Sequence, residues 1–563
     1  AFNFSQSYIA DTLANHLDIT RNLVALFKSK FDPKVNKGSV KELQRIERLH
    51  RKIIDSLEQV QSLNEDQVIR RYVEMIEGTL RTNFFRKNEA GENRDFISLK
   101  LAPRNIDNIP EPRPLFEIFV YSPRVEGVHL RGGKVARGGL RWSDRLQDYR
   151  TEVLGLVKAQ QVKNAVIVPS GAKGGFVAKQ LPSASNREQF MAEGVACYQI
   201  FIRGLLDVTD NLHDGELVPP PQVVRLDEDD PYLVVAADKG TATFSDIANA
   251  ISQDYNYWLG DAFASGGSQG YDHKAMGITA RGAWVSVQRH FKEMGMNIQR
   301  EDFSVIGIGD MAGDVFGNGM LLSEHICLIA AFNHQHIFID PNPNSAASFN
   351  ERKRLFQISR STWQDYDNKI ISSGGGVFSR SAKSIAITPA MRKRFAIDAK
   401  VLSPNELLTA LLLAPVDLIW NGGIGTYVKG SNESHADVGD KANDALRING
   451  GQLRCKVFGE GGNLGVTQKG RVEFSLAGGA CNTDFIDNAA GVDCSDHEVN
   501  IKILLNELVV CGDMTEKQRN LLLVKMTAEV AEMVLDNNYS QTQAISVAQD
   551  EVGYRIGEYR RLM

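Results

Sequence analysis

The chain has 563 residues, of which 43% are hydrophobic and 24% are charged, a composition typical of a globular protein. Its formal net charge of −5 argues against a nucleic-acid-binding protein, and we find no apolar run long enough to span a membrane. The 6 cysteines include no C-x-x-C pair, which favours free thiols in a reducing cytoplasm. This length predicts two or more domains.

The first 90 residues predict helices. The stretch "VKELQRIERLHRKIIDSLEQVQSL" places apolar residues three or four positions apart, which is the helical period. We therefore expect a helical N-terminal segment over 1–90, and nothing in it points to catalysis.

Residues 91–282 change to an alternating pattern. The stretches "RPLFEIFVYS", "NAVIVPS" and "YLVVAA" are typical of strands, and "REQFMAEGVACYQIFIRGLL" is typical of a helix. A second alternating pattern covers 283–494, beginning with the helical "AWVSVQRHFKEMG" and the strand "FSVIGIG". The fold class is therefore α/β with two α/β domains. We expect 495–563 to form helices that pack back on the first of them. Because there is no initiator methionine, we also expect the chain to be part of a longer polypeptide.

The second pattern contains a dinucleotide-binding fingerprint. Gly307, Gly309 and Ala312 form G-x-G-x-x-A, with Asp310 and Met311 between them, after a predicted strand and before a predicted helix. The glycines would let the backbone approach a pyrophosphate, whose charge the helix N-terminus favours.

Asp340 ends the next predicted strand, "HIFID". A carboxylate there would bind the ribose hydroxyls of NAD and repel the extra phosphate of NADP. Two features depart from the usual pattern: Asp340 lies beyond the usual spacing, and Asp310 brings a carboxylate near the phosphates.

Lys173 lies in the glycine-rich stretch "VPSGAKGGFVAK". It is not a P-loop lysine, because Gly174 follows it instead of Ser or Thr. Other cations and Asp238 lie on predicted loops nearby, so the cluster is either a solvated basic face or a site for a small dicarboxylate. Glycine on both sides favours the site, in which partial burial would lower the pKa of the lysine.

These residues also carry a resemblance to a known family. The chain resembles the glutamate dehydrogenases, most closely the large NAD-specific bacterial class, over nearly its whole length. The segments that carry the resemblance are "HLRGGKVARGGLRWSDR", "VKAQQVKNAVIVPSGAKGGF", "YLVVAADKGTATFSDIAN", "GYDHKAMGITARGAW", "VIGIGDMAGDVFGNGM", "VFGEGGNLGVTQ" and "NTDFIDNAAGVDCSDHE".

The resemblance implies roles for four residues in the first α/β domain. Lys173 would activate the water that attacks a substrate imine and would steady the carbonyl oxygen. Asp238 would move protons to and from the α-amino group. Lys163, with Gln160 nearby, would bind the substrate α-carboxylate.

The side-chain carboxylate of the substrate is expected to contact Ser495. Arg137 stands where the family usually has Lys and would grip this carboxylate, even bidentately, and Lys134 or Arg141 could contribute. The segment from Lys163 to Lys173 is also shorter than usual in the family.

Thr279 and Asn463 match family positions near the nicotinamide end of the cofactor. Asn421 begins "NGGIGT" after the apolar run "APVDLIW", and we interpret this stretch as a loop beside the nicotinamide rather than a plain turn. The sequence predicts no metal site.

The implied fold is a substrate domain with a glutamate-dehydrogenase-like fold plus a Rossmann NAD-binding domain. The implied activity is reversible NAD-dependent deamination of L-glutamate to 2-oxoglutarate and ammonia, in a cleft between the two domains of a cytoplasmic homo-oligomer. One alternative is a dehydrogenase for an apolar amino acid. The other is a non-catalytic nucleotide-sensing module of a large regulatory assembly. Oligomeric state and allosteric effectors stay open.

Overall fold

The computed structural model describes residues 4–88, 90–107, 109–163, 168–183, 185–236 and 242–562, with the backbone alone at 159–163 and 242. The chain divides into two compact units. Unit 1 contains Ala1–Gly270 and Ser495–Asn520, and unit 2 contains Tyr271–Cys494 and Leu521–Met563. Both units combine helices with a central sheet, so the predicted α/β class is confirmed.

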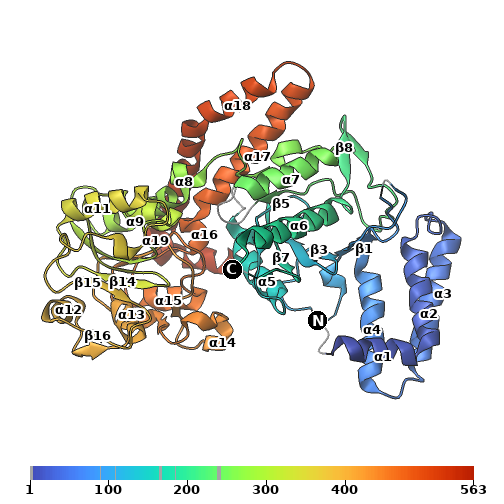
Figure 1. The fold of residues 1–563 in the computed structure, drawn as a ribbon, viewed down its shortest axis with the longest axis horizontal. Helices are drawn as coiled ribbons and strands as arrows, with labels where there is room; N and C mark the ends of the chain where they lie inside the picture. The colour runs from blue at the N-terminus through green and yellow to red at the C-terminus, as the bar shows by residue number, and fades with distance from the viewer. Residues whose placement is uncertain are drawn as a thin grey trace. The chain divides into compact units, whose positions relative to one another are not determined.

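Four helices open unit 1, drawn in blue in Figure 1. They are α1 (Gln6–Asn15), α2 (Leu17–Phe31), α3 (Val40–Leu57) and α4 (Leu63–Gly78). Leu26, Ile53 and Ile69 meet in their common core, and a capping box of Ser39 and Glu42 starts α3. The helical N-terminal segment is therefore present, although it ends at Gly78, where a strand begins.

The central sheet of unit 1 is mostly antiparallel, in the order β1-β2-β3-β4-β7-β5, with β6 also pairing with β7. Its strands are β1 (Thr79–Thr82), β2 (Ile97–Leu101), β3 (Phe116–Tyr121), β4 (Val125–Arg131), β5 (Ala136–Arg137), β6 (Leu140–Trp142) and β7 (Ser170–Ala178). Only β5 and β6 run parallel to a neighbour, which is β7 in both cases. Strand β7 therefore has partners on both sides.

Helices cover both faces of this sheet. Helix α5 (Tyr149–Lys163) packs on one face, where Val153 meets Val128 and Val177. Helices α6 (Arg187–Leu206) and α7 (Ala242–Asp254) share a core with the opposite face. The smaller elements of unit 1 are η1 (Pro103–Asn105), β8 (Asn211–His213), β9 (Glu216–Val218), β10 (Val235–Ala236), η2 (Gly260–Ala262) and β11 (Ala264–Ser265).

Unit 2 is built on a six-stranded sheet in the order β15-β14-β13-β12-β18-β21. The strands are β12 (Phe303–Ile308), β13 (Ile326–Phe332), β14 (His336–Ile339), β15 (Gly376–Ser379), β18 (Leu418–Asn421) and β21 (Val457–Glu460). Strands β13, β12, β18 and β21 are parallel, whereas β14 and β15 are antiparallel. The chain leaves β12 for β13 on one side, and β18 lies on the other side, so a topological switch point lies at β12.

Two apolar cores cover the two faces of this sheet. The helices of this part are α8 (His273–Met276), α9 (Ile278–Glu293), α10 (Asp314–Gly319), α11 (Ser345–Gln357), α12 (Pro389–Phe395), α13 (Pro404–Leu412), α14 (His435–Val438), α15 (Gln468–Leu476) and α16 (Asp484–Asp487). The smaller elements are η3 (Trp363–Asp365), β16 (Ile385–Ala386), β17 (Val401–Leu402), β19 (Val428–Lys429), η4 (Lys441–Asn443), β20 (Ile448–Asn449) and η5 (Gly450–Gln452).

Three helices end the chain: α17 (Ala489–Val510), α18 (Glu516–Lys525) and α19 (Thr527–Leu562). Helix α17 runs through the division between the units, because residues from Ser495 to Asn520 belong to unit 1 and residues from Leu521 onward to unit 2. This differs from the prediction that 495–563 packs on the first α/β domain. Among the described residues, no helix is long and apolar enough to cross a membrane.

Candidate functional site

Lys173 lies inside a strand and not on the predicted loop. It is in the middle of β7, paired with Leu130 of β4, and its exposed fraction is 7%. Side chains alternate between the faces of a strand, so Lys173 and Gly175 share a face. A Cβ built on Gly175 would lie 2.5 Å from Val153 of α5. Lys173 therefore points to the face that α5 covers.

The glycines around Lys173 are explained by packing within the protein. A Cβ at Gly174 would lie 2.3 Å from Leu140, and one at Gly138 would lie 1.5 Å from the carbonyl oxygen of Ala172. These positions admit no side chain whether or not a ligand is present. The prediction that the glycines serve a close approach to a ligand is corrected in this respect, because neighbouring strands and α5 fill the space.

Two predicted substrate-binding residues and one predicted catalytic residue are described only in part or not at all. Gln160 and Lys163 are in the last turn of α5, and their side chains lie outside the described residues, as does Asp238 altogether. Because α5 covers the face of the sheet that carries Lys173, the backbone of Gln160 and Lys163 is on the same side as Lys173. Their roles stay predictions.

Arg137 ties β5 to α17. Its exposed fraction is 5%, and its Nε donates to the hydroxyl of Tyr232 at 2.5 Å. Its Nη1 donates to the carbonyl oxygen of Asp496 at 2.8 Å, and its Nη2 donates to Oδ1 of Asn500 at 2.6 Å. Ser495, which precedes Asp496, is half-buried in the turn of α17 that this tie holds. A substrate carboxylate at Arg137 would share the guanidinium with these partners.

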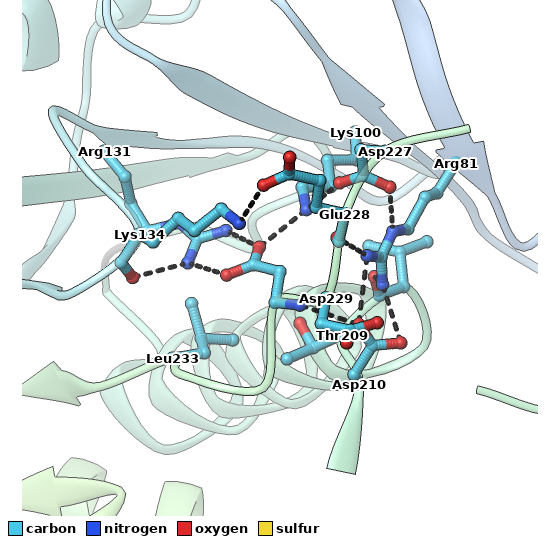
Figure 2. Close-up of polar contacts among 12 residues, drawn as sticks. Arg81, Lys100, Arg131, Lys134, Thr209, Asp210, Asp227, Glu228, Asp229 and Leu233 are labelled. Atoms are coloured by element: carbon cyan, nitrogen blue, oxygen red, sulfur yellow. Dashed lines mark hydrogen bonds and ion pairs between the residues drawn. The ribbon is translucent and has the colours of Figure 1, made fainter. Parts of the chain in front are cut away.

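The other basic residues of the predicted cluster have acidic partners. Arg141 pairs with Glu152 of α5 at 2.7 Å, and the Nζ of Lys134 pairs with Glu228 at 2.5 Å. Arg131 belongs to the buried ionic network drawn in Figure 2. The basic stretch is therefore largely neutralised within the protein, which weakens its predicted use as a dicarboxylate cluster.

The ionic network joins three strands of the unit 1 sheet to the irregular segment 223–234 (Figure 2). Its basic members are Arg81 of β1, Lys100 of β2, Arg131 of β4, Lys134 and Arg225, and its acidic members are Asp210, Asp227, Glu228, Asp229 and Asp230. Five cations thus face five carboxylates, so the network is neutral when all are ionised.

Asp230 lies at the centre of this network. Its Oδ2 accepts from Lys100 at 2.6 Å and also from Arg131, whose Nη1 donates to Oδ1 at 3.0 Å. Burial works to raise the pKa of Asp230, but Arg131 and Lys100 outweigh it and hold the pKa well below its usual value. Because Arg131 also donates to the carbonyl oxygen of Tyr232 at 2.8 Å, the network fixes the segment that leads to β10.

The predicted strand–turn–helix around the fingerprint is present in unit 2. Strand β12 ends at Ile308, Gly309 has a φ of 139°, and α10 begins at Asp314. A Cβ at Gly307 would lie 2.4 Å from the ring of Phe316, and one at Gly309 would lie 2.8 Å from its Cβ. The two glycines therefore let α10 pack closely on β12, which is one use of glycine in dinucleotide-binding turns.

The remaining residues of the fingerprint shape the turn. Asp310 accepts from the backbone N–H of Gly313 at 3.1 Å and from Nδ2 of Asn333 at 2.9 Å, so its carboxylate is engaged inside the protein. Met311 is buried, and the carbonyl oxygen of Ala312 accepts from Lys274 at 3.1 Å. The turn follows the strand at the switch point, which is where a dinucleotide fits in such sheets.

The strand direction contradicts the ribose role predicted for Asp340. Strand β14 is antiparallel to β13, and the N–H of Asp340 donates to Ile329, whereas the fingerprint turn starts beside Phe332. Three residues of strand separate these points, about 10 Å. Asp340 is fully buried, accepts from Ser372, and has its pKa raised by burial. Asn333, directly after β13, occupies the position that Asp340 was expected to have.

The other predicted cofactor residues lie at the carboxyl ends of parallel strands or near them. Asn421 is the last residue of β18 and pairs with Ile308 of β12. Asn463 is exposed on the loop after β21 and accepts from Asn488 at 3.2 Å. Thr279 is in the first turn of α9, and a Cβ built on Gly491 would lie 2.6 Å from its hydroxyl. Asn421 therefore borders the switch point, and its place beside the nicotinamide stays a prediction.

Sequence reasoning missed a group of buried acidic residues beneath the loop of Asn463. Glu460 ends β21 beside Asn421, and Asp484 and Asp487 are in α16. A signal was present in the sequence, since Glu460 directly precedes the glycines of "VFGEGGNLGVTQ". Within the described residues, no group of three or more His, Cys, Asp or Glu side chains could hold a metal ion.

Comparisons with known proteins place the chain in a family. Residues 52–548 match the family model "Bacterial NAD-glutamate dehydrogenase, catalytic domain", and residues 1–33 match "Glutamate dehydrogenase, helical motif 3". The chain is 67% identical over 562 residues to a NAD-specific glutamate dehydrogenase of Pseudomonas aeruginosa, a match covering 100% of the chain and 35% of the relative. It is 57% identical over 561 residues to the Mycobacterium tuberculosis protein of that name, covering 97% of the chain and 34% of the relative. The chain thus spans about a third of the length of these relatives.

Among solved structures, glutamate dehydrogenase 2 of Plasmodium falciparum is 14% identical, with a TM-score of 0.45 and coverage of 95% of this chain and 97% of that one. The family match extends over most of the chain, including both sheets and the residues around Lys173 and Gly309. The chain belongs to the bacterial NAD-glutamate dehydrogenase catalytic-domain family.

Proposed function

We propose that this chain catalyses the reversible NAD-dependent oxidative deamination of L-glutamate to 2-oxoglutarate and ammonia. The observation that carries the proposal is the burial of Lys173 in β7, on the face covered by the helix that carries Gln160 and Lys163, in a chain whose family match spans 52–548.

The proposed chemistry assigns each residue a task in unit 1. Lys173 holds the water that attacks the substrate imine and stabilises the negative charge that develops on oxygen. Asp238 exchanges a proton with the α-amino group. Lys163 and Gln160 bind the α-carboxylate, which orients the α-carbon. NAD, when bound, accepts the hydride from that carbon.

We propose that NAD binds at the carboxyl ends of β12 and β18. The fingerprint turn from Gly309 onward would take the pyrophosphate, and Asn421, Asn463 and Thr279 would lie toward the nicotinamide. The switch point at β12 and the glycine geometry of the turn support this placement. The preference for NAD rests on the family and its relatives, since Asp340 does not support it.

The substrate's side-chain carboxylate is the open part of this proposal. Arg137 is engaged with Tyr232, Asp496 and Asn500, and Arg141 is engaged with Glu152. We propose that Ser495, held by the Arg137 tie, completes the anchor. Because both arginines already have partners within the protein, an apolar amino acid is the alternative substrate. The test therefore compares substrates. A cytoplasmic location and a homo-oligomer remain part of the proposal, from the free cysteines and the family resemblance.

The experiment measures NADH formation with L-glutamate, L-leucine and L-phenylalanine in the wild-type protein and in Lys173→Met, which removes the ammonium group and keeps an unbranched side chain. We expect turnover with glutamate alone and a loss of kcat of about 10²- to 10⁴-fold in the variant, the usual range for a general acid–base group. Lys179→Met is the matched control, because Lys179 directly follows β7 and pairs with Glu126 at 2.9 Å near the surface.

Three results would count against the proposal. Equal kcat in Lys173→Met and the wild type would remove the catalytic role of Lys173. Faster turnover of leucine or phenylalanine would favour the apolar amino-acid dehydrogenase. NAD binding with no NADH from any of the three substrates would favour the non-catalytic nucleotide-sensing module.

A further inference from the structure

The loop 461–466 of unit 2 has an exposed tip between buried ends. It connects β21 to α15, and Asn463 and Leu464 at its tip are exposed, whereas Gly461, Gly465 and Val466 are buried. Leu464 has a φ of 57°, a conformation that a non-glycine residue adopts only at a cost. Contacts elsewhere must therefore hold this loop in shape.

Two buried carboxylates bind the backbone of this loop, and a third binds the residue before it. Glu460 accepts from the N–H of Gly465 through Oε1. Asp484 accepts from the N–H of Leu464 at 3.0 Å, and Asp487 accepts from the N–H of Glu460 itself at 2.9 Å. Hydrogen bonds from backbone N–H to ionised acceptors are stronger than neutral ones. The strained Leu464 is thus fixed between two such bonds.

Arg471 of α15 joins two of the carboxylates. Its Nη2 donates to Oε2 of Glu460 at 2.6 Å and lies 3.3 Å from Oδ1 of Asp484. One buried guanidinium therefore pairs with two of the three buried carboxylates. Burial raises the pKa of Glu460 to about 7, with Arg471 opposing the shift and Asp484 adding to it.

Other groups complete the surroundings of these acids. Burial raises the pKa of Asp487 to about 6, and this carboxylate faces Asn482 and Ser286 as well as Arg471. Cys481 is the further titratable group near Glu460 and Arg471. The Asn421 side chain lies against Gly465, so the loop rests on the ends of both β18 and β21.

We propose that Glu460, backed by Arg471, is a positioning residue that fixes the loop 461–465 and thereby presents Asn463 to the nicotinamide end of NAD. The inference rests on the proposed function for its ligand. It differs from a general stabilising role, because Glu460 and Asp484 bind main-chain N–H groups of the loop that carries a predicted cofactor residue, next to the switch point.

The test compares Glu460→Ala, Glu460→Gln and Glu351→Ala with the wild type. Glu351 is the matched control: it is also a buried glutamate of unit 2, pairs with Arg354 at 2.6 Å, and accepts from a backbone N–H, that of Asp367, at 2.7 Å. Three quantities are measured: the Kd for NAD by calorimetric titration, the Tm, and hydrogen–deuterium exchange of the peptide 461–466 without cofactor.

In Glu460→Ala we expect faster exchange of this peptide and a Kd for NAD about tenfold higher, the loss usual for a charged hydrogen bond. Glu351→Ala should lower the Tm without changing the Kd or this exchange. Glu460→Gln keeps the shape and an acceptor oxygen, so it should fold and bind NAD more weakly than the wild type. The wild-type Kd should rise from pH 8 to pH 6, and the Kd of Glu460→Gln should rise less over this range, since Asp487 with its pKa of about 6 is the acid that still titrates beside the loop.

The inference is overturned if Glu460→Ala or, where that variant does not fold, Glu460→Gln keeps the wild-type Kd, exchange rate and pH dependence. Absence of NAD binding in the wild-type protein would instead reject the proposed function. In that case the exchange of 461–466 still decides whether Glu460 anchors the loop.

Discussion

Removal of the charge of Asp230 should destabilise unit 1 strongly. Asp230→Asn leaves Lys100 and Arg131 buried with one carboxylate fewer between them, and both side chains are almost fully shielded from water. Breaking a buried ion pair by removing one partner costs about 3–5 kcal/mol. For a unit of this size, such a loss lowers the Tm by about 10 °C.

Asp229→Asn is the control for this prediction. Asp229 is the neighbouring residue of the same network, but its side chain is 65% exposed and pairs with Arg225 at 2.8 Å. An exposed pair contributes at most about 1 kcal/mol. Differential scanning calorimetry of the two variants should therefore give a large shift for Asp230→Asn and almost none for Asp229→Asn. Equal shifts would refute the reasoning, since they would mean that burial does not govern the cost.

The pH dependence of the same network follows from the sign of the shift. The pKa of Asp230 is lower in the folded protein than in the unfolded chain, so between these values the unfolded chain binds the extra proton. The stability that Asp230 contributes is therefore complete above about pH 4, its ordinary range, and is lost as the pH falls below it. Asp230→Asn should lose less stability than the wild type over this acid range, as measured by Tm.

Three further predictions concern other positions. Gly138→Ala puts a Cβ 1.5 Å from the carbonyl oxygen of Ala172, so it should lower the free energy of unfolding by at least about 2 kcal/mol and lower kcat. Gly155→Ala in α5 has open space around its Cβ, so it should change the free energy of unfolding by less than about 1 kcal/mol. Urea unfolding measures both values. Asp340→Asn should leave the ratio of Kd for NAD and NADP unchanged, and a shift toward NADP would restore its predicted ribose contact. The Tm of Glu460→Gln should rise relative to that of the wild type from pH 5 to pH 8. The folded wild-type protein keeps a proton on Glu460 up to about pH 7, so the wild type loses stability as the pH rises and the variant does not lose this contribution. A Tm difference between the two proteins that stays constant with pH would contradict this.

Patterns within single segments of the sequence correctly predicted several helices and strands. The helix α6 spans the whole stretch that its periodicity indicated, and β3 lies within "RPLFEIFVYS". The strand, turn and helix around Gly309 also follow from residues that are neighbours in sequence. In each case the hydrophobic period or the glycine spacing is a property of a single segment.

The failures concern contacts between distant segments. Glycines around Lys173 suggested a loop, but Gly174 and Gly175 lie in a strand that pairs with β4 and β6. These positions are glycine because Leu140 and Val153 occupy the space that a side chain would need. Arg137 contacts Asp496, which is 359 positions away. No spacing rule connects such residues, so a basic run cannot be distinguished from a neutralised network by sequence alone.

Asp340 shows that the direction of a strand is a nonlocal property too. The sequence predicted a strand ending at Asp340, and β14 does end at Ile339. The strand runs antiparallel to β13, however, which carries Asp340 away from the fingerprint turn. A single segment contains no information on the direction of its neighbour, so a correctly predicted strand led to a ribose role that the strand direction does not support.

Asp230 of unit 1 and Glu460 of unit 2 should respond differently to pH. This difference can show which unit controls the pH dependence of NAD binding. In unit 1 the network has five basic and five acidic side chains, and the pKa of Asp230 is held low, so this carboxylate stays ionised near neutrality. In unit 2 one arginine pairs with two of three buried carboxylates, and Glu460 exchanges its proton at about pH 7. A change in NAD binding between pH 6 and pH 8 should therefore originate in the loop of Asn463. It should persist in Asp230→Asn and become smaller in Glu460→Gln, and the reverse pattern would show that the ionic network of unit 1 controls the cofactor.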